Sequence, residues 1–156
     1  MQLDDTPQWA LDMVHDNKWQ FYISNKNFHN LSVDVKERDI WSSARAINGT
    51  LSNDNQLLVP LPLPLARVPP QVIPPPPAPG TPINHPPAFL APSLVPGPAH
   101  ALFPNTRGDL RTLTEAQLAV LFPAYNLPVP QKAAGAPTNL STQRAAFGHF
   151  VGVYWV

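Results

Sequence analysis

The chain contains no cysteine, which excludes disulfide bonds, cysteine-ligated zinc and thiol nucleophiles. It also has no apolar run near the ~20 residues of a membrane span, and its first residues lack the pattern of a signal peptide. The five histidines are scattered, and none stands at metal-site spacing from another or from a carboxylate. Neither a glycine-rich phosphate loop nor a serine nucleophile elbow occurs. We therefore expect an intracellular, non-enzymatic protein with no cofactor and no membrane partner.

Proline, in contrast, is abundant. It supplies 22 of the 156 residues, and 17 of these lie between Pro60 and Pro104. Each proline removes a backbone donor and fixes φ, so neither a helix nor a sheet can run through such a segment. The composition predicts a largely disordered, proline-rich protein. In it a linker over residues 59–104 separates a small α+β unit, residues 1–58, from a short α-helical unit, residues 105–156.

The linker has two possible roles, as a spacer or as a ligand. Its composition favours polyproline II, which acts as a semi-rigid spacer of roughly 3.1 Å per residue. Within it, an apolar residue followed by four prolines is typical of segments that aromatic-lined grooves bind. The residues of this candidate partner-binding site are Ile73, Pro74, Pro75, Pro76 and Pro77. Arg67 lies three residues before Pro70, but the spacing of an SH3 ligand fails because position 73 is isoleucine.

The N-terminal unit shows both helical and strand-like spacing. Thr6 and Pro7 are typical of a helix start, and alternating apolar residues at 19–23 and at 31–35 predict two strands of a hairpin. Helical spacing returns at 40–47, with Asn48-Gly49 as the C-terminal cap. The first helix is expected to bury the stripe Trp9, Ala10, Met13 and Val14. We interpret the tryptophans at 9, 19 and 41 as core residues.

The C-terminal unit begins with a predicted helix over residues 113–122. Two capping boxes mark its start, Thr112 with Glu115 and Thr114 with Gln117. Pro123 should end or kink this helix, and Asn126 can reverse the chain in a left-handed conformation. A second helical signal covers 139–147, with Asn139 or Ser141 as its cap. The apolar residues 150–156 favour a final strand, or alternatively a free C-terminus that adds to a sheet edge.

This stretch resembles the SAP motif, a helix–extended loop–helix module that binds DNA. The matching residues, without a gap, are Leu113-Thr114, Leu118, Leu121, Tyr125, Leu127-Pro128 and Lys132. The resemblance covers residues 113–132 only. It departs from the family pattern at Pro123, at Asn126 and Gln131 where the family has glycines, and at 133–138, where a second helix should begin. The resemblance implies a nuclear protein that contacts duplex DNA.

The charges agree with such a partner in sign. Residues 1–58 carry eight acidic and five basic side chains, whereas residues 105–156 carry four basic and two acidic ones. The candidate nucleic-acid-binding residues are Arg107, Arg111, Lys132 and Arg144. Contacts of this kind reach phosphates, so binding would be weak, mostly electrostatic and salt-dependent. Duplex-DNA binding is therefore the first functional prediction. The alternative is a scaffold or adaptor whose proline-rich segment is a ligand for a polyproline-reading domain.

Overall fold

The computed structural model describes residues 6–131 and 138–154. Within these residues four helices follow one another, with bounds α1 Gln8–Asn48, α2 Arg107–Thr112, α3 Glu115–Ala124 and α4 Leu140–Val151. Among the described residues there is no strand, and isolated β-bridges join Leu57 with Thr106 and Pro62 with Ala99. The expectation of a small α+β unit in a largely disordered chain is therefore wrong.

The predicted hairpin lies within α1, which runs unbroken for 41 residues. Trp19 and Val33 are buried, whereas Phe21, Leu31 and Val35 are exposed. Residues two apart on a helix differ by about 200°, so they lie on opposite sides. The alternation that imitates strands thus arises because α1 carries apolar residues on two opposite sides.

The residues of α1 that are buried were not those expected. Trp9 and Met13 are exposed, and the buried side instead includes Leu11, Trp19 and Tyr22. Four polar residues interrupt that side, namely His15, His29, Glu37 and Asn48. These polar positions break the apolar repeat from which a helix is usually identified.

The chain forms two compact units, and both are discontinuous in sequence. One comprises Met1–Asp34 with Ala66–Ser93, and the other comprises Val35–Leu65 with Leu94–Val156. Each unit therefore combines part of α1 with proline-rich residues. The boundaries of these units therefore differ from the expected boundaries at residues 58 and 104.

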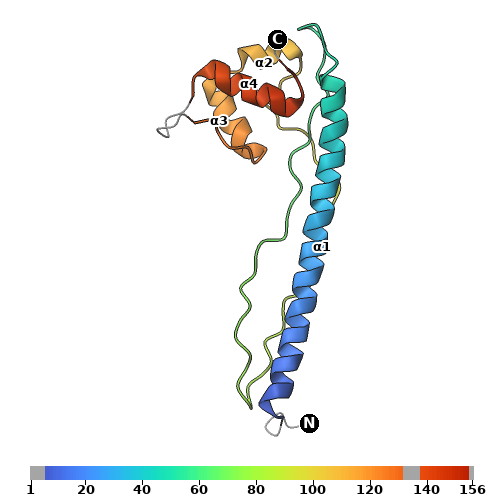
Figure 1. Cartoon of the computed structure of the whole chain (residues 1–156), viewed down its shortest axis with the longest axis vertical. Helices are drawn as coiled ribbons and strands as arrows, with labels where there is room; N and C mark the ends of the chain where they lie inside the picture. Colours follow the sequence, from blue (N-terminus) through green and yellow to red (C-terminus); the bar gives the residue numbers. More distant parts are fainter. Residues whose placement is uncertain (1–5, 132–137, 155–156) are drawn as a thin grey trace. The chain divides into compact units, whose positions relative to one another are not determined.

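In the first unit the proline-rich segment forms two extended arms beside the N-terminal part of α1 (Figure 1). We call residues 66–77 the outgoing arm and residues 82–93 the return arm. In the return arm burial repeats every third residue. Ile83, Pro86, Phe89 and Pro92 are half-buried, and the residues between them are exposed. Polyproline II has three residues per turn, so each arm places one of its three edges against α1.

In the second unit α2, α3 and α4 enclose an apolar core. Leu58, Leu61 and Phe103, all from or beside the predicted linker, belong to this core. The remaining buried members are Ala44, Leu110, Leu113, Leu118, Leu121, Phe122, Tyr125, Phe147, Val151 and Val153. The proline-rich segment was expected to stay outside any core, but both of its ends contribute to this one.

The local helix signals in the C-terminal part are present. Thr114 and Gln117 form a reciprocal capping box at α3, and Asn139 caps α4. Thr112 does not start a helix, because it is the last residue of α2, whose own box joins Thr106 and Asp109. Pro123 lies in the last turn of α3, and the helix ends one residue later, as expected.

The expected C-terminal strand is wrong within the described residues. Phe150 and Val151 complete α4, and Gly152 then adopts a left-handed conformation with φ 98°. A Cβ atom at this position would lie 2.6 Å from the carbonyl oxygen of Arg45, so only glycine fits. Trp155 and Val156 lie outside the described residues.

Candidate functional site

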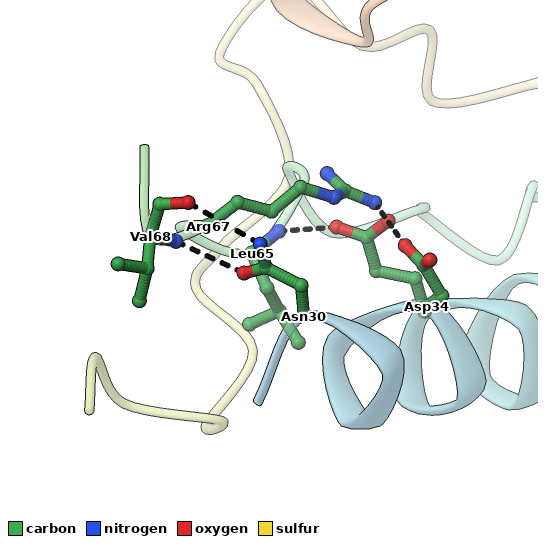
Figure 2. A network of polar contacts seen from close by, with 6 residues as sticks. Asn30, Asp34, Leu65, Arg67 and Val68 are labelled. Carbon is green, nitrogen blue, oxygen red and sulfur yellow. Dashed lines mark hydrogen bonds and ion pairs between the residues drawn. The ribbon is translucent and has the colours of Figure 1, made fainter. Parts of the chain in front are cut away.

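The outgoing arm is fixed to α1 at its beginning by side-chain contacts (Figure 2). The amide of Asn30 accepts from the backbone N–H of Val68 at 3.0 Å and donates to the carbonyl of Val68 at 3.2 Å. Next to this pair, Arg67 forms an ion pair with Asp34 at 2.7 Å. An extended arm has no internal hydrogen bonds. Asn30 therefore satisfies both backbone groups of Val68 as a neighbouring strand would.

The candidate segment Ile73–Pro77 lies at the far end of this arm. Pro74 and Pro77 are half-buried, whereas Ile73, Pro75 and Pro76 are exposed. The carbonyl of Pro77 accepts a hydrogen bond from Gln8 at 2.9 Å. Since residues three apart share an edge of polyproline II, the edge of Pro74 and Pro77 faces α1. The other two edges face solvent.

A tight turn joins the two arms. The N–H of Thr81 donates to the carbonyl of Ala78 at 3.1 Å, and Gly80 has φ 79°. Proline at the second position and a glycine with positive φ at the third are the residues that a type II turn requires. Pro79 and Gly80 occupy these positions, so the reversal is encoded locally.

The return arm is fixed to α1 by aromatic packing. The ring of Phe89 lies 6.0 Å from that of Tyr22 and 6.1 Å from that of His29, edge-on in both cases. Lys18 Nζ lies 2.9 Å from His85 Nδ1. Phe89 thus packs between two side chains that lie about two turns apart on the buried side of α1, and it sets the register of this arm.

Three of the four predicted nucleic-acid-binding residues lie in the described part of the chain, and they are engaged to different degrees. Arg144 Nε donates to the carbonyl of Leu113 at 2.7 Å, which ties α4 to the junction between α2 and α3. Arg111 forms an ion pair with Asp54 at 3.1 Å, and both side chains are about half exposed. Arg107 is half-buried at the start of α2. Lys132 lies outside the described residues.

Among the described residues of the second unit, burial perturbs the pKa values of Tyr125 and Arg45. Burial raises the pKa of Tyr125, although a backbone hydrogen bond from His100 lowers it in part. The hydroxyl of Tyr125 donates to the carbonyl of Leu61 at 2.7 Å and accepts from the N–H of His100 at 3.2 Å. Through these two hydrogen bonds Tyr125 holds both ends of the proline-rich segment to the core. The second group is Arg45: burial lowers its pKa, and a smaller electrostatic effect of Tyr154 raises it.

Sequence reasoning missed every α1 residue that holds the arms. The expected hairpin has Tyr22 in its first strand and Asn30 in its loop. Gln8 lies at the start of the expected first helix. The signal that could have found them is the three-residue spacing of Ile83, Pro86, Phe89 and Pro92. Such a period is typical of a polyproline II edge that packs against another element.

The described residues contain no cluster of histidines, aspartates or glutamates able to hold a metal ion. No helix in this part of the chain is long and apolar enough to span a bilayer. No protein-family model matches the chain, and no curated protein or solved structure is detectably similar to it.

Proposed function

We propose that the chain is a non-enzymatic scaffold protein that presents Ile73–Pro77 to a polyproline-reading domain. One observation carries this proposal: α1 covers a single edge of the segment and leaves Ile73, Pro75 and Pro76 in solvent. Aromatic-lined grooves of SH3, WW and EVH1 domains bind this kind of preformed helix from outside. The fixed arm would also lower the entropy that a free linker loses on binding.

Duplex-DNA binding is the weaker of the two functional hypotheses. Arg144 is committed to the carbonyl of Leu113, and Arg111 is paired with Asp54. A phosphate would have to compete with these contacts. The chain also has no net charge to attract a polyanion. The likeness of residues 113–132 to the SAP motif remains a prediction.

The proposal is tested by titrating the full chain with purified EVH1, WW and SH3 domains in a calorimeter. We expect saturable binding to at least one of them, and at least about a tenfold loss of affinity in the double variant Pro75→Ala, Pro76→Ala. The matched control is Pro69→Ala, Pro70→Ala, because these prolines are exposed on the same arm but lie outside the segment.

Two results would remove the scaffold proposal. One is that none of the three domain classes binds the full chain. The other is that both double variants lose the same affinity, since the exposed edges at 75 and 76 would then have no special part. Salt-sensitive binding of an AT-rich duplex by the full chain, measured by fluorescence anisotropy, would instead favour DNA as the partner.

A further inference from the structure

Helix α1 carries a second apolar side that no described residue of the first unit covers. Its five large residues are Trp9, Met13, Phe21, Phe28 and Leu31, which we call the apolar stripe. Phe21 and Phe28 are 70% and 74% exposed, and Trp9 is 67% exposed. Single exposed apolar residues are common on protein surfaces, but a run of five along one helix is not.

Helix geometry places these five residues on one side. At about 100° per residue, they fall within roughly a third of the helix circumference. The buried residues Leu11, Trp19 and Tyr22 fall on the opposite side. Gln8, His29 and Asn30, which contact the arms, also lie toward that side. The stripe therefore extends for about 33 Å along α1, facing away from both arms.

The chemistry of the stripe suits a buried interface. Between Met13 and Leu31 the other residues on this third of the helix are neutral, namely Asn17, Gln20, Ser24 and Asn27. The two lysines of this stretch, Lys18 and Lys26, fall outside the stripe by the same helix geometry. Depletion of charge with enrichment of aromatic residues marks the centre of protein interfaces. A lipid surface is a poorer match, because helices that bind one usually flank their apolar side with basic residues.

The area is enough for a weak dimer. Each aromatic side chain offers about 150–250 Å², so the three rings of the stripe expose roughly 400 Å², and Met13 and Leu31 add to this. Two copies would together bury on the order of 1,000–1,400 Å², which is the lower range of specific interfaces. One copy facing another therefore reaches the area that association needs.

The order of large and small residues gives the direction of pairing. Phe21 and Phe28 alternate with Ser24 and Asn17 along the stripe. In an antiparallel pair centred between residues 22 and 23, Phe21 faces Ser24 of the other copy and Phe28 faces its Asn17. Phe21 and Phe28 then each meet a smaller residue. A parallel pair in register would instead stack ring on ring and leave gaps at Ser24, which loses packing contacts.

We propose that the apolar stripe is a self-association surface, through which α1 of one chain packs antiparallel on α1 of a second copy. Residues 17–28 form the centre of this two-fold interface. Each side-chain contact occurs twice, as in any isologous interface. The surface is separate from the segment Ile73–Pro77, so a dimer would present two such segments to a partner and raise the apparent affinity by avidity.

The first experiment measures the mass of the full chain by sedimentation equilibrium over a concentration series. We expect a reversible dimer. Phe28→Lys should raise its dissociation constant at least about a hundredfold, because a central aromatic is lost twice and each loss costs about tenfold or more. Leu90→Lys is the matched control, since Leu90 is 84% exposed but lies on the return arm. Far-UV circular dichroism should show unchanged helix content in both variants.

Three outcomes would overturn the proposal. The chain could stay monomeric up to about 1 mM. Leu90→Lys could weaken the dimer as much as Phe28→Lys does, which would make the association non-specific. A monomer that co-sediments with phosphatidylcholine vesicles, and loses this binding in Phe28→Lys, would assign the stripe to a lipid surface.

A second experiment tests the direction. Asn17→Glu and Phe28→Lys should each be largely monomeric alone, since each places an unpaired charge in the interface. Mixed together they should form a heterodimer, because the carboxylate introduced at position 17 of one chain would face the ammonium group introduced at position 28 of the other. A parallel pair in register brings these two positions nowhere near each other. A mixture that stays monomeric would therefore overturn the antiparallel register.

Discussion

The side-chain amide of Asn48 connects three parts of the second unit. It is fully buried at the last residue of α1. Its Nδ2 donates to the carbonyls of Val59 at 3.1 Å and Val151 at 3.0 Å, and its Oδ1 accepts from the N–H of Val59 at 2.7 Å. A buried amide of this kind stabilises the fold only if its partners stay paired.

We expect Asn48→Ala to lower the free energy of unfolding by about 2–4 kcal/mol, because backbone groups of Val59 and Val151 would lose their partner in the core. Urea unfolding followed by circular dichroism measures this change. Asn27→Ala is the matched control on the same helix. Asn27 is exposed, so its replacement should change the free energy by about 0.5 kcal/mol or less. Equal effects of the two variants would contradict the role of Asn48.

Because of Tyr125, the free energy of unfolding should depend on pH in the alkaline range. Its pKa in the folded chain is raised from the usual 10.0. The folded state therefore keeps the proton where the unfolded chain has lost it, and the contribution of this residue to stability falls as pH rises above about 10. Below that pH the contribution is constant.

We expect Tyr125→Phe to cost about 1–2 kcal/mol at neutral pH, because the hydrogen bonds to Leu61 and His100 are lost. The difference from the unaltered chain should narrow as pH rises above about 10, since phenylalanine does not titrate. Urea midpoints measured between neutral and alkaline pH check this. A difference that stays constant across the range would show that the Tyr125 hydroxyl does not titrate differently in the two states.

At the scale of elements, the sequence predicted best where the signal is local. The capping box of α3 and the cap of α4 depend on residues three apart, and both are present. The left-handed Asn126, with φ 55°, also agrees with its expected role in reversing the chain. Such features depend on few neighbours, so the surrounding sequence is sufficient to predict them.

Helix α1 could not be predicted in the same way, because its burial pattern depends on distant residues. His29 lies on its buried side only because Phe89 packs there, and Asn30 is occupied only because Val68 is extended beside it. A polar residue facing a proline-rich arm looks solvent-exposed from its sequence neighbours. The site residues on α1 were missed for the same physical reason.

The three-residue repeat of the return arm gives a prediction at this scale. We expect Phe89→Ala to lower the free energy of unfolding by about 2 kcal/mol, since its half-buried ring contacts Tyr22 and His29. Leu90→Ala should change it by about 0.5 kcal/mol or less, because Leu90 lies on an exposed edge. Urea unfolding of both variants measures the pair. If Leu90→Ala costs as much as Phe89→Ala, the arm does not pack with a period of three.

At the scale of the whole molecule, neither compact unit is a continuous piece of the chain. Residues 105–156, expected to be a unit of their own, contain α2, α3 and α4. They lack Leu58, Leu61 and Phe103, which complete the core around these helices. The hydroxyl of Tyr125 would also lose its partners Leu61 and His100. The composition distinguishes a proline-rich linker from the segments on either side. The core nevertheless contains residues of the linker as well as residues of the helices.

We therefore expect an isolated 105–156 fragment to show little helix and no cooperative unfolding, because short helices are marginal in water without tertiary packing. Far-UV circular dichroism with a urea titration measures both properties. Adding a fragment of residues 1–104 should restore helix content, since it supplies the missing core residues and their backbone partners. The same addition with Leu61→Asp in the longer fragment should fail, because an unpaired carboxylate would enter the core. A 105–156 fragment that unfolds cooperatively by itself would show that α2, α3 and α4 do not need the proline-rich segment.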